Sequence, residues 1–263
     1  DLAAHTSDWE DPISTDYRGI TCWESPPANQ GIAGLEALNI AEGWDVAAMG
    51  SQTAETYHHF IEAMRLAFSD AFRYVADPTK SEVPTAHLLS KEYAATRRAL
   101  IDPNLAMKTA PYGQVTGGSD TVYITCVDGK GNACSFINSV YNNFGTGMIV
   151  PGTGIALHNR GALFSLEPGH PNELAPNKRP YHTIIPALAT KDNELYLCYG
   201  MMGAFMQPQG HLQLIRNMVD FGMDPQKAIN ALRFMVVDNG VLLEEGLPND
   251  VVSQIQKMGH GVQ

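Results

Sequence analysis

Residues 119–144 have the sequence SDTVYITCVDGKGNACSFINSVYNNF, the most informative stretch of the chain. It contains two β-rich runs, residues 121–127 and 133–140, separated by Asp128-Gly129-Lys130-Gly131-Asn132. Glycine, asparagine and aspartate favour tight turns, and two such runs joined by a short loop of this kind predict a β-hairpin. We therefore expect the rest of the chain to be arranged around this hairpin.

The residue that opens the first run, Thr121, follows the polar and glycine-rich segment Thr116-Gly117-Gly118-Ser119-Asp120. Such a junction allows the peptide bond between Asp120 and Thr121 to be cut, which would leave Thr121 as a new N-terminus. The hydroxyl of an N-terminal threonine can be activated by its own α-amine, whose reference pKa of about 8 suits a general base near neutral pH. The alternative is that Thr121 is only a β-branched residue that opens a strand, and the motif by itself favours this simpler interpretation.

The composition describes a chain that can bury a core, and it excludes some classes of partner. The chain has 263 residues, of which 44% are hydrophobic, and this length allows one or two domains. The formal net charge is -11, from 28 acidic and 17 basic residues. This charge argues against binding to nucleic acids or anionic membranes, because both attract basic surfaces. No run of about 18 apolar residues occurs, so we predict no membrane span.

Neither the cysteines nor the histidines have the spacing of a metal site. The cysteines are scattered without C-x-x-C spacing, which predicts buried free thiols at Cys22, Cys126, Cys134 and Cys198. His58 and His59 are adjacent, so on a helix they point in different directions, whereas a chelating pair prefers an i, i+4 spacing. We expect these two histidines in solvent or at the edge of the core, and we predict no metal and no cofactor.

Hydrophobic periodicity and breaker residues outline the remaining elements. Apolar residues at helical spacing predict helices over residues 31–43, 51–75, 90–101, 209–220 and 224–234. β-rich runs predict strands over residues 17–24, 155–160, 183–188 and 194–199. Ser51 is the expected N-cap of the longest helix. The basic side chains of the helix at 90–101 are expected to be solvated; they are Lys91, Arg97 and Arg98.

A glycine-containing turn at residues 200–204 connects the strand predicted over 194–199 to the helix that follows it. Backbone N–H groups at such a turn point towards a negative ligand, and an oxyanion hole is built from donors of this kind. The alternative is a tight connection that binds no ligand, which is the more common case for such a turn taken alone.

The chain resembles the γ-glutamyltransferase family of N-terminal-nucleophile hydrolases over nearly its whole length. The most specific motifs are Thr121 with Asp128 and Gly131-Asn132-Ala133, the turn Phe144-Gly145-Thr146-Gly147, and the loop Pro176-Asn177-Lys178-Arg179-Pro180. The resemblance implies an α+β fold, part of the four-layer αββα sandwich of that superfamily. It also implies autocatalytic cleavage between Asp120 and Thr121, which would separate the C-terminal part of a large subunit, residues 1–120, from a small subunit, residues 121–263.

The resemblance also implies roles for residues of the hairpin and of the glycine turn. Thr121 corresponds to the nucleophile that forms an acyl-enzyme, and Ser139 to a hydroxyl that hydrogen-bonds the nucleophile. Gly203 and Ala204 correspond to a glycine pair whose backbone N–H groups stabilise the oxyanion. Ala204 departs from that pair but retains the N–H group, so the donor survives the change.

The positions that would bind the substrate depart from family members specific for γ-glutamyl groups. The chain has Tyr141 in place of an asparagine, Arg160 in place of a glutamine, and His182-Thr183 in place of a serine pair. Leu163 stands in place of the aspartate that binds the substrate α-amine, and it cannot pair with a buried ammonium group. Arg160 can instead attract a carboxylate, as in glutaryl-type acyl groups. The alternative role for Arg160 is a structural ion pair.

We therefore predict an autoprocessing amide hydrolase or acyltransferase, glutathione hydrolase-like, that acts on small amides or γ-glutamyl compounds and keeps its own cleaved subunit as heterodimer partner. The alternatives are an acylase for glutaryl or cephalosporin-type amides, and a catalytically silent fragment or homologue. The resemblance implies that parts of the family's chain precede and follow this sequence. Because the chain begins at Asp1 rather than Met, its compartment is left open, with the cytoplasm favoured over the periplasm or secretion.

Overall fold

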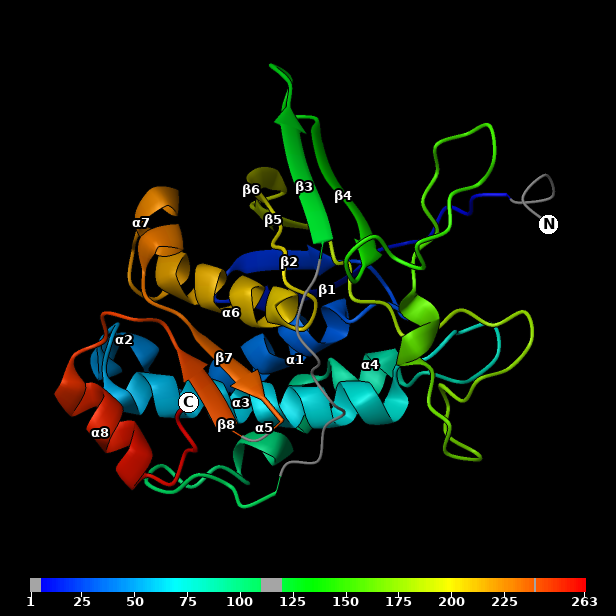
Figure 1. The fold of residues 1–263 in the computed structure, drawn as a ribbon. Helices are drawn as coiled ribbons and strands as arrows, with labels where there is room; N and C mark the ends of the chain where they lie inside the picture. Colours follow the sequence, from blue (N-terminus) through cyan, green and yellow to red (C-terminus); the bar gives the residue numbers. More distant parts are fainter. Residues whose placement is uncertain (1–5, 110–119, 239) are drawn as a thin grey trace.

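The computed structural model describes residues 6–109, 120–238 and 240–263 (Figure 1). Its four-stranded sheet is antiparallel and has the strand order β1-β2-β5-β6. The strands are β1 (Ile13–Tyr17), β2 (Ile20–Glu24), β5 (Ala187–Lys191) and β6 (Glu194–Tyr199). Residues before and after the expected cleavage point thus contribute to one sheet. The glycine-rich segment at 112–119 lies outside the described residues, and the division of the chain after Asp120 stays a prediction.

The core is built by three helices that pack together beneath this sheet: α1 (Gly31–Ala41), α3 (Ala54–Tyr74) and α6 (Met206–Val219). Figure 1 shows α1 between the sheet and α3, and all 11 residues of α1 are buried. Helix α3 begins at Ala54 because Thr53, not Ser51 as predicted, is its N-cap. The Thr53 hydroxyl accepts a hydrogen bond from the N–H of Thr56 at 3.2 Å.

Helix α5 (Lys91–Arg98) is tied to the core by basic side chains, so the prediction that they are solvated is wrong for Arg97 and Arg98, whereas Lys91 is exposed. The Arg98 guanidinium donates to the carbonyls of Ile40 and Asn39 at 2.6 and 3.0 Å. These carbonyls belong to the last turn of α1, where a helix leaves its C=O groups without helical partners, so Arg98 caps α1. Arg97 and Lys91 form ion pairs at 2.8 and 2.6 Å, with Asp70 and Glu42 respectively.

The predicted hairpin is confirmed as β3 (Asp120–Val127) paired with β4 (Ala133–Tyr141). Figure 1 shows this hairpin standing out from the body of the molecule, with the start of β3 towards the body and the turn at 128–132 away from it. The apolar side chains on its outer face are more than half exposed, and they are Val122, Ile124 and Phe136.

All four cysteines are free, as predicted, but burial is predicted correctly only for Cys22. Cys126 and Cys134 lie opposite each other across the β3–β4 ladder and are exposed, because they belong to the outer face of the hairpin. Cys198, in β6, is partly exposed.

Other predicted elements are shorter than expected or absent. Residues 155–160 contribute only an isolated bridge and the start of the 3₁₀ turn η2 (Arg160–Leu163). The strand predicted over 183–188 begins only at Ala187, because Pro186 has no N–H to donate to a ladder.

The C-terminal part has a hairpin that the sequence analysis does not predict. The helix expected over 224–234 is only α7 (Pro225–Asn230), and β7 (Phe234–Val237) follows it and pairs with β8 (Gly240–Leu243). Helix α8 (Asn249–Lys257) lies beyond this hairpin, and two short helices, α2 (Val46–Met49) and α4 (Thr85–Leu88), flank α3 in the sequence. No helix of the described ranges is long and apolar enough to cross a bilayer.

His58 in α3 contacts His260 near the C-terminal end of the chain, and both side chains are buried. The neighbouring His59 is also buried, so neither His58 nor His59 lies in solvent. The Nδ1 atom of His58 lies 2.7 Å from Nε2 of His260, and its Nε2 lies 2.7 Å from the carbonyl oxygen of Asp102. Burial, followed by the charges of His58 and Arg65, lowers the pKa of His260 to about 3.

The depressed pKa of His260 predicts loss of stability in acid. The unfolded chain takes up a proton at this imidazole near pH 6.5, whereas the folded chain does so only near pH 3. The free energy of unfolding contributed by this group is therefore present above pH 6.5 and is lost as the pH falls towards 3. We expect urea unfolding of the wild type to lose on the order of 2 kcal/mol more than His260→Gln between pH 7 and pH 5. The exposed His87 supplies the control, His87→Gln, and parallel pH curves for wild type and His260→Gln would contradict the prediction.

Candidate active site

The expected nucleophile lies at the start of β3, on the inner face of the hairpin. The β3–β4 register places Thr121 opposite Ser139, and the Thr121 hydroxyl donates a hydrogen bond to the Ser139 hydroxyl at 3.1 Å. The Ser139 hydroxyl oxygen also accepts from the backbone N–H of Tyr141 at 3.0 Å. The ladder is irregular between Asp120 and Thr121. The two hydroxyls are thus held together at the end of the strand where the chain is expected to be cut.

Tyr141 and Arg160 extend this chain of contacts into the interior. Tyr141 is buried and has a left-handed φ of 79°. The Arg160 guanidinium lies 5.3 Å from the centre of the Tyr141 ring, within range of a cation–π interaction. Its Nη1 atom donates to the hydroxyl of Thr183. The structure therefore brings together the residues at three of the positions expected to bind substrate.

Arg160 is a fully buried cation without an acidic partner among the described residues. Its Nε and Nη2 atoms have no hydrogen-bond acceptor there. Burial lowers its pKa to about 10, which leaves the guanidinium charged at neutral pH. The structural ion pair considered as its alternative role is therefore not found in this part of the chain. A buried guanidinium in this state provides two donors for an anion.

The imidazoles next to Arg160 are held neutral. Burial, followed by the charges of Arg160 and His158, lowers the pKa of His182 to about 3. The pKa of His158 is lowered in the same sense by burial and by Arg160. The two rings lie 6.4 Å apart. Of the three side chains Arg160, His158 and His182, Arg160 is therefore the one that is charged at neutral pH.

The glycine turn leaves β6 beside the hairpin. A Cβ atom added to Gly200 would lie 2.3 Å from the ring of Tyr123, which is two residues from Thr121 in β3. Beyond this contact, Gly203 and Ala204 have left-handed φ angles of 112° and 51°. They lead directly into α6, whose N-terminus carries a partial positive charge.

The backbone N–H groups of Gly203 and Ala204 donate no hydrogen bond within the described ranges. The Gly203 carbonyl accepts from the N–H of Met206 at 2.9 Å, so it points into the first turn of α6. Because the C=O and N–H of a trans peptide point in opposite directions, the Ala204 N–H points away from the helix. It is therefore available to an anion, as an oxyanion hole requires.

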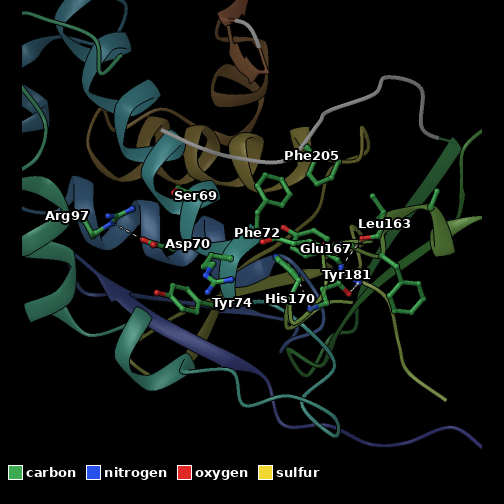
Figure 2. Close-up of a pocket in the computed structure, with 15 residues that line it drawn as sticks. Ser69, Asp70, Phe72, Tyr74, Arg97, Leu163, Glu167, His170, Tyr181 and Phe205 are labelled. Atoms are coloured by element: carbon green, nitrogen blue, oxygen red, sulfur yellow. Dashed lines mark hydrogen bonds and ion pairs between the residues drawn. The ribbon is translucent and has the colours of Figure 1, made fainter. Parts of the chain in front are cut away.

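A cavity of about 810 Å³ lies between the C-terminal half of α3 and the loop after η2 (Figure 2). It reaches the end of the glycine turn, because Phe205, which follows Ala204, is one of its lining residues. Its walls include Phe72, Tyr181 and Phe205, and the Asp70–Arg97 ion pair lies on another side (Figure 2). Leu163 also lines it, whereas Thr121 and Arg160 do not. The sequence does not indicate this cavity, because aromatic residues at helical or alternating spacing indicate core; Leu163 stands out only as a departure from the family, and Arg97 only as a side chain expected in solvent. Within the described ranges no group of three or more His, Cys, Asp or Glu residues is placed to hold a metal ion.

Comparisons with known proteins agree with the resemblance. The family model described as Gamma-glutamyltranspeptidase matches residues 1–263. The glutathione hydrolase-like YwrD proenzyme of Bacillus subtilis (strain 168) is 35% identical over 269 residues, covering 100% of this chain and 50% of that protein. The oxamate amidohydrolase proenzyme of Klebsiella pneumoniae is 33% identical over 269 residues, again covering 100% of this chain and 50% of that protein.

The structure is similar to that of a cephalosporin acylase from Bacillus halodurans. The TM-score is 0.91 at 46% identity, and the match covers 100% of this chain and 47% of that chain. The predicted α+β fold, a part of the N-terminal-nucleophile hydrolase fold, is thus confirmed. The chain spans about half the length of the curated relatives it matches.

The contact between Gly200 and Tyr123 predicts that Gly200→Ala destabilises the protein. Its methyl group would overlap the Tyr123 ring, which the hydrogen bond of its hydroxyl to Ser135 at 2.8 Å holds in place. Overpacking of this kind costs about 1–3 kcal/mol, to be measured as the free energy of unfolding in urea. Gly161→Ala is the matched control, because a Cβ there meets nothing within 4 Å. Equal unfolding midpoints for the two variants would contradict the prediction.

Proposed function

The chain belongs to the gamma-glutamyltranspeptidase family, and from this premise we propose that the full-length protein cuts its own peptide bond before Thr121 and then hydrolyses amides. The observation that carries the proposal is the hydrogen bond of 3.1 Å between the hydroxyls of Thr121 and Ser139. The names of the relatives, a glutathione hydrolase-like proenzyme and an amidohydrolase proenzyme, support both the cleavage and the class of reaction.

Self-cleavage begins with the Thr121 hydroxyl. Its oxygen attacks the carbonyl carbon of Asp120, and the C–N bond between the two residues breaks as an ester forms and the nitrogen takes up the proton. Water then hydrolyses the ester and leaves a carboxylate on Asp120 and a free amine on Thr121. The hydrogen bond to Ser139 holds the attacking oxygen in place during this step.

In the reaction with substrate, the hydroxyl oxygen of Thr121 is again the nucleophile, and the α-amine that cleavage has freed acts as its base. The α-amine of Thr121 takes the hydroxyl proton as the oxygen attacks the substrate carbonyl, and the proton passes to the leaving amine. The backbone N–H groups of Gly203 and Ala204 donate to the oxyanion that forms in this step. The resulting ester on Thr121 is resolved by water in a hydrolase or by an acceptor amine in a transferase.

Arg160 indicates the kind of acyl group that this protein transfers. Two nitrogen atoms of its buried guanidinium have no hydrogen-bond partner in the part of the chain that the structure describes, and a carboxylate would provide acceptors for both. Leu163 supplies no acid for the α-ammonium of a γ-glutamyl group. One relative is named for oxamate, an amide whose acyl group carries a carboxylate. Both γ-glutamyl and glutaryl groups end in a carboxylate, and they differ in the α-ammonium group that only γ-glutamyl carries. We therefore favour acyl groups that end in a carboxylate and lack this ammonium group, such as glutaryl.

Arg160 is enclosed in the uncut chain, where it is 0% exposed. A substrate carboxylate reaches it only if the surrounding loops open after cleavage. The acyl site is therefore expected to form in the cleaved protein and not in its precursor.

The cleavage is tested with intact mass spectrometry of the full-length protein. The wild type is expected to separate into two polypeptides at the Asp120–Thr121 bond and to gain the mass of an acyl group on Thr121 when mixed with substrate. Thr121→Ala should remain one polypeptide and lose about 10³-fold or more of its activity. Thr125→Ala, which changes the same residue type in the same strand, is the control and should be cleaved like the wild type. A protein that hydrolyses amides while residues 120 and 121 stay joined would refute the proposal, and a single uncut, inactive wild type would identify the silent homologue.

The acyl group is tested by comparing anilide substrates. Arg160→Met should lower kcat/KM for a glutaryl anilide about 10²-fold, because it removes one partner of a buried charge pair. It should change kcat/KM little for a butyryl anilide, which has no carboxylate. Arg160→Lys keeps the charge and should retain part of the preference. Turnover of a γ-glutamyl anilide by the wild type that equals or exceeds that of the glutaryl anilide would contradict the assignment.

A further inference from the structure

Gln30 joins two parts of the candidate site that are distant in the sequence. It lies directly before α1 and is 0% exposed. Its backbone N–H donates to the carbonyl of His182 at 3.0 Å, and the N–H of His182 donates to the carbonyl of Ala28 at 2.9 Å. The backbone around Gln30 is therefore attached to the pair His182-Thr183.

The side chain of Gln30 makes a second connection. Its Nε2 atom donates to the carbonyl of Thr183 at 2.7 Å and to the carbonyl of Ala204 at 2.9 Å. Because both partners are carbonyl oxygens, only the amide nitrogen can face them, and both of its protons are used. The Oε1 atom accepts a longer hydrogen bond from the Tyr181 hydroxyl at 3.5 Å.

The two carbonyls belong to the two functional parts of the site. The Thr183 side chain contacts Arg160, whereas Ala204 supplies one of the N–H groups expected to stabilise the oxyanion. Ala204 has a left-handed φ of 51°, a conformation that is unfavourable for an L-residue. Its carbonyl is fixed by Gln30 and by the N–H of Gln207 at 3.1 Å. Gln30 thus helps to hold Ala204 in the conformation that directs its N–H away from α6.

We propose that Gln30 is a positioning residue, which sets the distance between the acyl-binding residues and the oxyanion amides. The proposal rests on the proposed function. The hydrogen bonds of the Gln30 side chain reach Thr183 and Ala204 and not Thr121, so Gln30 acts through Thr183 and Ala204. A misplacement of about 1 Å between a bound substrate and its catalytic groups can cost about 10²-fold in rate, which sets the scale of the expected effect.

A second buried glutamine provides a matched control. Gln213 in α6 is 1% exposed, and its Nε2 donates to the carbonyls of Gln209 and Phe234, each at 3.0 Å. These carbonyls join α6 to β7 and belong to neither part of the candidate site. Gln213→Glu therefore makes the same chemical change, at similar burial and with the same number of lost donors, in a place that serves only the fold.

The experiment compares Gln30→Glu with Gln213→Glu in the full-length protein, with a glutaryl anilide and with the proposed acylation of Thr121 followed by mass spectrometry. An ionised carboxylate at position 30 repels the two carbonyls, whereas its protonated form restores one donor. Burial raises the pKa of such a carboxyl group, so the ratio of the kcat of Gln30→Glu to that of the wild type at the same pH should be about 10- to 100-fold below one at pH 8 and should return towards one as the pH is lowered to 5. KM should change little, because the Thr183 hydroxyl and Arg160 are retained.

The pH dependence must be assigned to position 30 and not to its surroundings. Gln30→Met, which removes the donors without adding a charge, should lower kcat by a similar factor at every pH. The titratable and charged groups around position 30 are Tyr181, His182, Arg160 and the Glu24–His211 pair. They are also present in the wild type and in Gln30→Met, so any effect of their titration on kcat is seen in the pH curves of those two proteins as well.

The possible results separate this inference from the proposed function. Absence of an acyl group on Thr121 in the wild type overturns the proposed function and, with it, the role of Gln30. An acyl group in the wild type together with an unchanged kcat in Gln30→Glu overturns the role of Gln30 alone. The same is true if Gln30→Glu and Gln213→Glu lose kcat equally, since that result indicates a general loss of folded protein. A loss of kcat with a new pH dependence in Gln30→Glu only supports the inference.

Discussion

The antiparallel register of β3 and β4 is the constraint on which the candidate site depends. It places Thr121 opposite Ser139, so the two side chains share the inner face of the hairpin. Because side chains alternate along a strand, a slip of one residue would move every inner side chain to the other face. The turn Asp128-Gly129-Lys130-Gly131-Asn132 fixes this register, since the Asp128 carboxylate accepts hydrogen bonds from the backbone of Lys130 and Asn132 at 2.8 and 2.9 Å. A turn far from the chemistry thereby holds the two hydroxyls together.

The four-stranded sheet has a related consequence for the proposed cleavage. Strands β1 and β2 precede Thr121 in the chain, β5 and β6 follow it, and β2 pairs directly with β5. The core likewise mixes both parts, because α1 and α3 pack with α6. Breaking one peptide bond removes none of these contacts. The two products of the proposed cleavage would therefore be held together by the same sheet and core that fold the uncut chain.

The sequence predicts those parts of the structure that depend on local signals. The hairpin follows from its β-rich runs and its turn, and α1, α3 and α6 follow from helical spacing. The prediction fails where contacts between distant parts of the chain determine the local structure. Arg98 is drawn to the open carbonyls at the end of α1, and Phe234 enters a strand because β8 is available to pair with it. The roles expected for Thr121, Ser139 and Arg160 come from the resemblance to the family and stay predictions; the structure shows the contact between Thr121 and Ser139. The lack of an acidic partner for Arg160 among the described residues and the double hydrogen bond of Gln30 both depend on distant residues, so no local pattern indicates them.

The outer face of the β3–β4 hairpin affects the solubility of residues 1–263 when they are prepared on their own. Val122, Ile124 and Phe136 are 61, 52 and 53% exposed and lie together on two paired strands. An exposed apolar patch of this kind favours association with other molecules in water. Sulfate and phosphate salts strengthen contacts of this type, so the solubility of residues 1–263 is expected to decrease in them. A lysine or glutamate introduced on this face would be the first change to make for handling it in solution.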